Sequence, residues 1–565
     1  MGALVLFVSC AWLVLVFALD AYAIWPRPRS MTSGLQALRL SPNFTITPTF
    51  DSSNASDIAS AIMRMQALIQ SDKLGRLVVG RGSSDASAIQ TADELDSLEL
   101  SLNGANSSGL GSISNIAMEA QKPLLERDES YILTIPSDGF PATLSANTSL
   151  GLFRGLTTFS QLWYDFDGVT YTVNMPMTIE DAPAFPYRGF MLDTARNFFP
   201  VSDIKRTLDA MSWVKINNFH WHVTDSQSFP IQVPGFLELS SAGAYSNSSI
   251  YTLSDVQDIV QYAGERGIDI LVEIDSPGHS AAIGESHPEH IACFHASPWS
   301  SFAGEPPSGQ LRITSSATAN FTASLFSAVA SIMPSSLLST GGDEINIPCF
   351  DSDPETQMSL NATGMTIEQA LSNFTQATHG ALIDAGKTPV VWEEMVLEHN
   401  VTLSNETIVM VWISSEHAAD VASKGFRLVH GPSDYFYLDC GAGEWLGGDI
   451  TGNSWCDPFK TWQKAYSFDP FANLTAEQQT LVLGGQQLLW TEQSGPQNVD
   501  SIVWPRAAAS VEVFWTGGTV ADGGLNVTEA LSRLHEMRYR MVQRGVRAIP
   551  LQPEWCALRP GECDA

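Results

Sequence analysis

Two adjacent carboxylates, Asp343 and Glu344, follow the apolar run 337–340 after Gly341 and Gly342. Carboxyl groups are the usual acids and bases of glycoside hydrolysis, in which one of them protonates the leaving oxygen. Successive side chains of an extended segment point to opposite sides, so this pair could not easily flank one anomeric carbon as acid and nucleophile. We therefore expect the two groups to address different atoms. The alternative is a solvated acidic turn.

Substrate assistance is one reaction that needs such a pair. In it, the 2-acetamido oxygen of a sugar attacks C1 of the same sugar, and no protein nucleophile is required. Glu344 would then act as general acid and later as base. Asp343 would orient the acetamido N–H and stabilise the positive charge of the oxazolinium.

Polar and aromatic side chains also follow the other apolar runs of this region. They are Asp193 and Arg196; His222, Asp225 and Gln227; Asp275 and His279; Trp392, Glu393 and Glu394; Trp412; Tyr437 and Asp439; and Trp490 and Glu492. Folding alone does not demand carboxylates and tryptophans at so many strand ends, whereas a sugar site uses both. The competing interpretations are core aromatics for the tryptophans and a surface ion pair for Arg196.

Eight short apolar runs, most of them separated by helical stretches, must carry these residues. The runs are 187–192, 218–223, 269–274, 337–340, 389–392, 408–412, 427–430 and 487–489. Later helices are predicted at 323–332, 367–384, 418–423, 506–515 and 527–544. This alternation over about 370 residues predicts an α/β fold, a (β/α)8 barrel whose active site forms at the carboxyl ends of its strands. The long segment before the last run fits least well, because it carries Cys440 and Cys456 instead of an obvious helix.

The chain divides into three predicted parts: a signal peptide at 1–23, a small N-terminal α+β domain at 24–182, and the catalytic barrel with a C-terminal helix at 183–565. Within the second part, a loose section at 104–114 is predicted to be a linker or a processing region.

The N-terminus and the cysteines indicate the secretory route. An apolar run ends in a small-residue pattern typical of cleavage after Ala23, with an uncleaved membrane anchor as the alternative. Cleavage removes Cys10 and leaves six cysteines: Cys293, Cys349, Cys440, Cys456, Cys556 and Cys563. An even number in a secreted chain predicts three disulfides, and the simplest pairing joins them in order.

Twelve Asn-x-Ser/Thr sequons support the same compartment, so we expect a secreted, extracellular glycoprotein. They are Asn43, Asn54, Asn106, Asn147, Asn247, Asn320, Asn361, Asn373, Asn400, Asn405, Asn473 and Asn526. The balance of 29 Lys and Arg against 61 Asp and Glu gives a formal net charge of -32, which makes nucleic acid an unfavourable partner.

Eight segments resemble, in their order, family 20 glycoside hydrolases, the β-N-acetylhexosaminidases, and their fungal members most closely. The segments are RGFMLDTARNFFP, HWHVTDSQSFP, EIDSPGHS, GGDE, VVWEE, YLD, LWTE and WPRAAASVEVFW. The resemblance implies an exo-acting, retaining enzyme without a cofactor, which removes terminal N-acetylglucosamine or N-acetylgalactosamine from glycans and chitin oligomers. Fungal relatives also imply a propeptide and a homodimer.

The resemblance further implies roles for the remaining site residues. Arg196 would hold the C3 and C4 hydroxyls, Glu492 the C4 and C6 hydroxyls, and Asp439 the C4 or the C6 hydroxyl. Asp225 with His279 would support the catalytic acid. Trp392, Trp412 and Trp490 would wall the acetamido pocket, and Tyr437 would bind the acetamido oxygen. Trp462 would stack under the next sugar, with Trp445 and Trp455 in the same loop as competitors.

Three rival interpretations accompany these expectations. One is a family relative that releases a disaccharide, and another is a glycan-binding protein without catalysis. The third is a metal site at His220, His222, Asp225 and His279, which is disfavoured because no second carboxylate has recognised ligand spacing. We expect no metal.

Overall fold

The computed structural model describes residues 24–51, 55–103, 113–518 and 525–563. The predicted signal peptide, most of the predicted processing region, and the sequons Asn54 and Asn106 lie outside the described residues. Among the described residues, no helix is long and apolar enough to cross a membrane.

Eight parallel strands close into a barrel, which confirms the predicted fold. They are β7 (Tyr187–Asp193), β8 (Asn218–Thr224), β9 (Asp269–Ile274), β12 (Leu337–Ser339), β13 (Thr388–Trp392), β14 (Ile408–Val411), β15 (Arg427–His430) and β16 (Val482–Leu489). Only β16 differs much from its predicted range, since it begins five residues before the predicted start at Gln487. Gly484 and Gly485 interrupt the apolar pattern, so the first half of this strand could not be recognised in the sequence. A Cβ on Gly484 would lie 1.8 Å from the Tyr187 carbonyl oxygen, so glycine is needed there for close strand packing.

Helices surround the barrel and bury the apolar stripes that their 3.6-residue period predicts. The main ones are α5 (Val201–Trp213), α7 (Leu253–Gly264), α8 (Ser316–Ile332), α11 (Ile367–Asp384), α13 (His417–Ser423) and α18 (Arg506–Thr516). Shorter ones lie in the loops: α6 (Leu237–Gly243), α9 (Ile347–Ser352), α10 (Pro354–Thr363), α12 (Glu394–Leu397) and α17 (Val499–Val503). The segment before β16 contains three short helices that the sequence did not predict, α14 (Ser433–Phe436), α15 (Trp462–Tyr466) and α16 (Ala476–Gln479).

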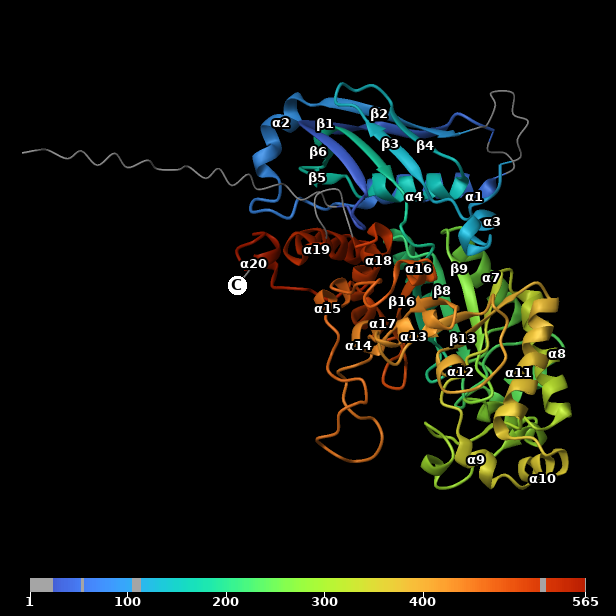
Figure 1. The fold of residues 1–565 in the computed structure, drawn as a ribbon. Helices are drawn as coiled ribbons and strands as arrows, with labels where there is room; N and C mark the ends of the chain where they lie inside the picture. Colours follow the sequence, from blue (N-terminus) through green and yellow to red (C-terminus); the bar gives the residue numbers. More distant parts are fainter. Residues whose placement is uncertain (1–23, 52–54, 104–112, 519–524, 564–565) are drawn as a thin grey trace, which may run out of the picture.

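The N-terminal region forms a six-stranded sheet in the order β1-β2-β4-β3-β6-β5, with β1 also paired to β6. Its strands are β1 (Ser30–Pro48), β2 (Asp93–Leu102), β3 (Tyr131–Ile135), β4 (Ala142–Ala146), β5 (Tyr164–Phe166) and β6 (Val169–Asp181), and its helices are α1 (Ser56–Ser71), α2 (Ala86–Thr91), α3 (Ile116–Ala120) and α4 (Ser149–Ser160). Every residue of α4 is buried, because this helix lies between the sheet and the barrel (Figure 1).

Buried ion pairs join this region to the barrel. Glu129 accepts hydrogen bonds from Arg154 of α4 at 2.6 Å and from Arg188 of β7 at 2.7 Å. Burial alone would raise the pKa of Glu129, but the two guanidinium groups lower it to about 2. Because Arg188 lies near the start of β7, the N-terminal region covers the amino end of the barrel and leaves the carboxyl end free.

The C-terminal helix α19 (Val527–Gln543) also binds the N-terminal region: Arg540 donates to the Gln161 and Trp163 carbonyls. The short α20 (Glu554–Ala557) follows it. The six cysteines pair in order, as predicted: Cys293–Cys349, Cys440–Cys456 and Cys556–Cys563. The first bridge ties the loop after β9 to α9, which follows the GGDE segment.

Candidate active site

A cavity of about 300 Å³ opens at the carboxyl ends of the strands. Nine of the predicted site residues line it: Arg196, His279, Asp343, Glu344, Trp412, Tyr437, Asp439, Trp490 and Glu492. Asp225 and Trp392 are buried directly behind this lining, at 1% exposure each. The residues that line the cavity come from loops after six different strands, which is how a barrel assembles a site from distant parts of the chain.

The GGDE segment is a tight turn, so the premise that it is extended is wrong. Gly341 has φ +69°, Gly342 has φ +98° and Glu344 has φ +50°, all in the left-handed region. A Cβ on Gly341 would lie 1.8 Å from Asp275 Oδ1, so only glycine fits there. Left-handed backbone at a non-glycine residue is strained, and such strain is typical of functional sites. The turn nevertheless separates the two carboxylates, since Asp343 is buried and the Glu344 side chain is 38% exposed in the cavity.

Glu344 faces a buried histidine and carboxylate pair. Its Oε2 lies 3.5 Å from His279 Nε2, and His279 Nδ1 lies 3.1 Å from Asp225 Oδ1. Burial would raise the pKa of Glu344, but the hydrogen bond and charge of His279, together with the charge of Arg196, hold it below its usual value. The pKa of His279 is raised well above its usual value, because the Asp225 and Asp343 carboxylates outweigh its burial. A proton can therefore move between Glu344 and His279 over a short path.

Asp343 is paired with a second carboxyl group, Asp275, at the end of β9. Burial and then the charge of Asp343 raise the pKa of Asp275 well above its usual value, while burial also raises that of Asp343. Asp275 Oδ1 accepts from the Gly342 N–H at 3.1 Å, which holds the turn in place. Since two buried carboxylates cannot both ionise at close range, we infer that they share one proton.

Arg196 is held by carboxylates on several sides. Its Nη2 lies 2.9 Å from Asp225 Oδ2 and 3.2 Å from Glu305 Oε2, and its Nε lies 4.0 Å from Glu492 Oε1. These charges outweigh the effect of burial and raise the pKa of Arg196 further. Its Nε has no hydrogen-bond partner among the described residues, so it can donate to a ligand.

Aromatic rings form the wall beside the catalytic pair. Trp412 stacks on Tyr437 at 6.3 Å between ring centroids, and Trp490 contacts both Tyr437 and Trp392. The Trp412 indole donates to Glu394 at 2.8 Å, which fixes its orientation. The Tyr437 hydroxyl makes no hydrogen bond to any described residue. This wall fits an apolar methyl group beside a polar oxygen.

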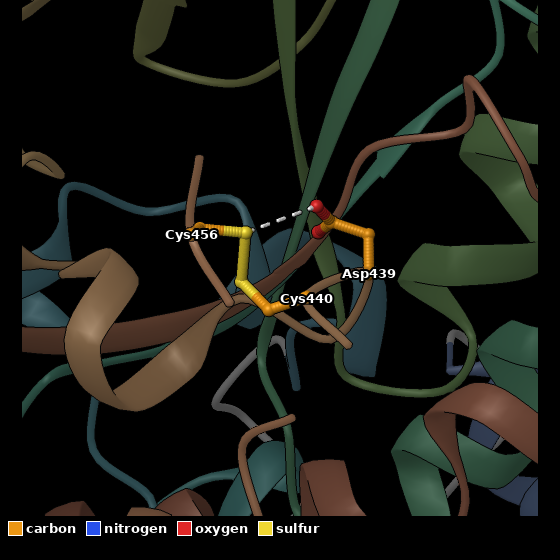
Figure 2. Close-up of side chains that lie close together, drawn as sticks. All are labelled: Asp439, Cys440 and Cys456. Atoms are coloured by element: carbon orange, nitrogen blue, oxygen red, sulfur yellow. Dashed lines mark hydrogen bonds between the residues drawn. A yellow bond between two sulfur atoms is a disulfide. The ribbon is translucent and has the colours of Figure 1, made fainter. Parts of the chain in front are cut away.

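Asp439, which lines the cavity, lies next to the Cys440–Cys456 disulfide (Figure 2). Its Oδ2 lies 3.8 Å from Cys456 Sγ. Burial raises the pKa of Asp439 to about 7, so below that pH it is an uncharged carboxylic acid. The disulfide thus holds a group that can both donate to and accept from a sugar hydroxyl.

The predicted role of Trp462 is wrong for this structure. Trp462 is the first residue of α15, is 5% exposed and packs against Tyr466 in the core. Trp455 instead lines the cavity, is 62% exposed and meets Trp412 edge-on at 5.4 Å. Trp445 and Glu305 also line the cavity. The position of Trp455 beside Cys456 was a sequence signal that could have placed it at the cavity. The sequence carries no such signal for Glu305, which lies in the loop after β9.

Two of the three groups of described residues that could offer metal ligands do not suit an ion. His222, Glu273 and Asp275 could offer three ligand atoms within 4.8 Å, as could Asp225, Asp275 and His279. However, His222 has a carboxylate oxygen at each ring nitrogen, 2.5 Å and 2.9 Å away, so no nitrogen lone pair is free. The third group, at Asp439, offers disulfide sulfurs and not thiolates.

Buried polar atoms without partners gather at this cavity. They include Asp343 Oδ1, Tyr437 OH, Asp439 Oδ1 and Arg196 Nε. Such groups are destabilising in an isolated protein, because each loses its bonds to water. Their concentration around one cavity indicates a site preorganised for a ligand rich in hydroxyl and amide groups.

Known proteins resemble the chain over most of its length. Residues 185–518 match the family model described as "Glycosyl hydrolase family 20, catalytic domain", and residues 24–162 match "beta-acetyl hexosaminidase like". The "Beta-hexosaminidase" of Arthroderma benhamiae is 36% identical over 460 residues, covering 77% of this chain and 74% of the relative. The "Chitooligosaccharidolytic beta-N-acetylglucosaminidase" of Bombyx mori is also 36% identical, covering 78% and 75%. The solved structure of Flavobacterium johnsoniae chitobiase is similar with a TM-score of 0.72 at 26% identity, covering 93% of this chain and 73% of that chain.

Proposed function

The chain belongs to glycosyl hydrolase family 20, and from this premise we propose that Glu344 is its catalytic acid and base and that Asp343 positions a nucleophile in the substrate. The protein is an exo-acting β-N-acetylhexosaminidase that acts on β-linked N-acetylhexosamine substrates. The observation that carries the two roles is the GGDE turn, which exposes Glu344 in the cavity and keeps Asp343 buried beside the aromatic wall.

In the first step, one bond to C1 of the terminal sugar forms while another bond to C1 breaks. The acetamido oxygen attacks C1 while the bond from C1 to the glycosidic oxygen breaks, and Glu344 gives its proton to that leaving oxygen. An oxazolinium forms. Water then attacks C1 from the side that the leaving group vacated, and Glu344 takes a proton from it. The bond from C1 to the acetamido oxygen breaks, which restores the acetamido group, and the sugar leaves with its configuration retained.

Asp343 and Tyr437 would stabilise the charge that develops in this step. The unpartnered Asp343 Oδ1 would accept from the acetamido N–H, and the unpartnered Tyr437 hydroxyl would donate to the acetamido oxygen. Trp412 and Trp490 would enclose the methyl group. These contacts strengthen as the ring closes, which is where they lower the barrier.

The closed end of the cavity would select a single terminal sugar. Arg196, Asp439 and Glu492 would bind its C3, C4 and C6 hydroxyls and leave no passage for a second residue. A volume of about 300 Å³ is at the lower limit for ligand cavities, which disfavours the release of a disaccharide. Either C4 epimer, N-acetylglucosamine or N-acetylgalactosamine, would be accepted.

Trp455 would stack on the next sugar, in the role that the sequence assigned to Trp462. It lies at the open side of the cavity beside Trp412, with most of its ring exposed. A chitin oligomer fits this arrangement, because each of its sugars presents an apolar face.

We also propose that the protein is secreted. All ten sequon asparagines in the described part of the chain are exposed, and three disulfides join its cysteines there. N-terminal sequencing of the secreted protein tests cleavage after Ala23. The homodimer rests on the family resemblance alone, and sedimentation analysis of the purified protein tests it.

Hydrolysis of aryl N-acetyl-β-glucosaminide and its galacto epimer tests the proposed reaction. We expect turnover of both, and strong inhibition by a thiazoline that mimics the oxazolinium. Binding without turnover between pH 3 and 8 would instead support a glycan-binding protein. Release of chitobiose from chitotetraose, with no monosaccharide, would support the disaccharide-releasing relative.

A further inference from the structure

A line of buried hydrogen-bonded side chains extends from the catalytic acid through the centre of the barrel. Beyond His279 and Asp225, Asp225 Oδ2 lies 2.9 Å from His222 Nε2, and His222 Nδ1 lies 2.5 Å from Glu273 Oε1. Glu273 Oε2 lies 3.0 Å from His220 Nε2. His220, His222 and Glu273 have no exposed surface at all.

The far end of this line determines where its protons are. The Tyr187 hydroxyl donates to Gln486 Oε1 at 2.7 Å, so the Gln486 amide nitrogen, 3.1 Å from His220 Nδ1, must donate to that ring. His220 therefore accepts at Nδ1 and donates from Nε2 to Glu273. This arrangement satisfies His220 as a neutral imidazole.

The hydrogen-bond partners of His222 differ from those of His220, because carboxylate oxygens lie at both ring nitrogens of His222. Both nitrogens must carry hydrogen to satisfy Glu273 and Asp225, which makes His222 an imidazolium cation. Burial would lower the pKa of His222, but the hydrogen bonds and charges of Asp225 and Glu273 raise it well above its usual value. The rings of His222 and Trp490 meet edge-on, with 4.8 Å between their centroids.

We propose that Glu273 is a positioning residue of the hydrolysis: it holds His222 as a cation, and this cation sets the protonation of the Asp225, His279 and Glu344 group. The proposal rests on the proposed role of Glu344 as catalytic acid. Glu273 touches no substrate and acts only through His222.

Other charged and titratable groups also face this line. They are Tyr187 and Asp193 on β7, Arg196 after β7, Asp275 after β9, Asp343 after β12, and Glu394 after β13. The Ser339 hydroxyl donates to Glu273. Arg196 remains on Asp225 whatever happens at Glu273, so the cation on His222 is the charge that Glu273 controls.

The variant Glu273→Gln tests the proposal. A glutamine that accepts from His220 presents its N–H to His222 Nδ1, so His222 becomes neutral and still donates to Asp225. Loss of the cation makes protonation of His279 and Glu344 easier. We expect the basic limb of the kcat/KM profile to move to higher pH by roughly 0.5 to 1 unit, because the lost cation is closer to Glu344 than the lost anion.

Glu129→Gln is the matched control, because Glu129 is a buried carboxylate with two cationic partners at the other end of the barrel. It should lower stability and leave both limbs of the profile unchanged. A folded Glu273→Gln protein with the wild-type profile would overturn the proposal, as would an equal shift in both variants.

Neutron diffraction from the wild-type protein at pH about 7.5 tests the charge state without any variant. We expect hydrogen on both ring nitrogens of His222 and on one of His220. A bare nitrogen on His222 would overturn the proposal even if Glu273→Gln does not fold. Because this measurement needs no activity, its outcome stays separate from failure of the proposed function, which a lack of turnover in the wild type would show.

Discussion

The two tryptophans of the loop before β16 give a sharp test of how the site binds its second sugar. Trp455 is 62% exposed at the cavity, whereas Trp462 is 5% exposed in the core. Trp455→Ala should therefore change binding with little effect on stability, and Trp462→Ala should do the reverse.

The structure sets the size of both effects. A tryptophan offers up to about 250 Å² of surface, so 62% exposure leaves about 150 Å² at Trp455, of which one face is about 75 Å². At about 25 cal/mol per Å², a sugar on that face contributes up to about 2 kcal/mol. Its loss should raise the KM for chitobiose by about 10- to 30-fold. Trp462→Ala leaves a core cavity and should lower the free energy of unfolding by about 3 to 5 kcal/mol.

The assay compares chitobiose with the glycosyl fluoride of N-acetylglucosamine, whose leaving group is too small to reach Trp455. We expect Trp455→Ala to impair hydrolysis of chitobiose only, with a free energy of unfolding within about 0.5 kcal/mol of wild type. Denaturant titration measures the stability of both variants. A folded Trp462→Ala protein with a selective defect on chitobiose, beside a Trp455→Ala protein without one, would refute the reasoning.

Three further outcomes follow from the site. Glu344→Gln should reduce kcat/KM for chitobiose by about 10²- to 10⁴-fold. The loss of kcat/KM for a dinitrophenyl glycoside should be much smaller, because a good leaving group needs little protonation. Equal losses for the two substrates would argue against an acid role. Tyr437→Phe should reduce kcat/KM by about 10²-fold, because it removes a hydrogen bond to the acetamido oxygen. It should also raise the free energy of unfolding by about 1 kcal/mol, because the buried Tyr437 hydroxyl has no hydrogen-bond partner among the described residues. A loss of stability would contradict this account. Stability should be highest near pH 4 to 5 and decline toward pH 8 in denaturant titrations. Burial raises the pKa of Asp439 to about 7 and that of Glu394 to about 9, so the stability that they contribute at low pH is lost as pH rises through those values. Burial would raise the pKa of Glu129, but Arg188 and Arg154 lower it to about 2, so the stability that it contributes is present at pH 5 and is lost as pH falls toward 2. An increase in stability from pH 5 to 8 would contradict these assignments.

The sequence alone was sufficient to predict the barrel and most of the residues that line its cavity. Apolar runs and helical stripes depend on residues a few positions apart, so their periods can be read directly from the chain. Strand ends then place side chains at one mouth, because all eight strands are parallel. That rule alone brought Arg196, His279, Asp343 and Glu492 to a single cavity.

The sequence could not determine contacts that depend on distant parts of the chain. The loop that carries Trp455 is held by Arg506, which donates to the Leu438 carbonyl at 2.7 Å and to the Lys460 carbonyl at 2.9 Å. No local pattern shows that a residue of α18 fixes this loop. The family resemblance, which implied Trp462, therefore could not determine which tryptophan of this loop is exposed.

The GGDE segment also has features that the sequence predicts and features that only the tertiary structure shows. Its two glycines and its place after a strand identify it in the sequence. The prediction that its two carboxylates act on different atoms assumed an extended backbone, which the structure does not have. Only the tertiary structure shows that it is a left-handed turn held by Asp275, and that a carboxylate oxygen lies at each ring nitrogen of His222. The reason is physical: the chain carries the groups, but their charges depend on which buried partners the fold brings within hydrogen-bond distance.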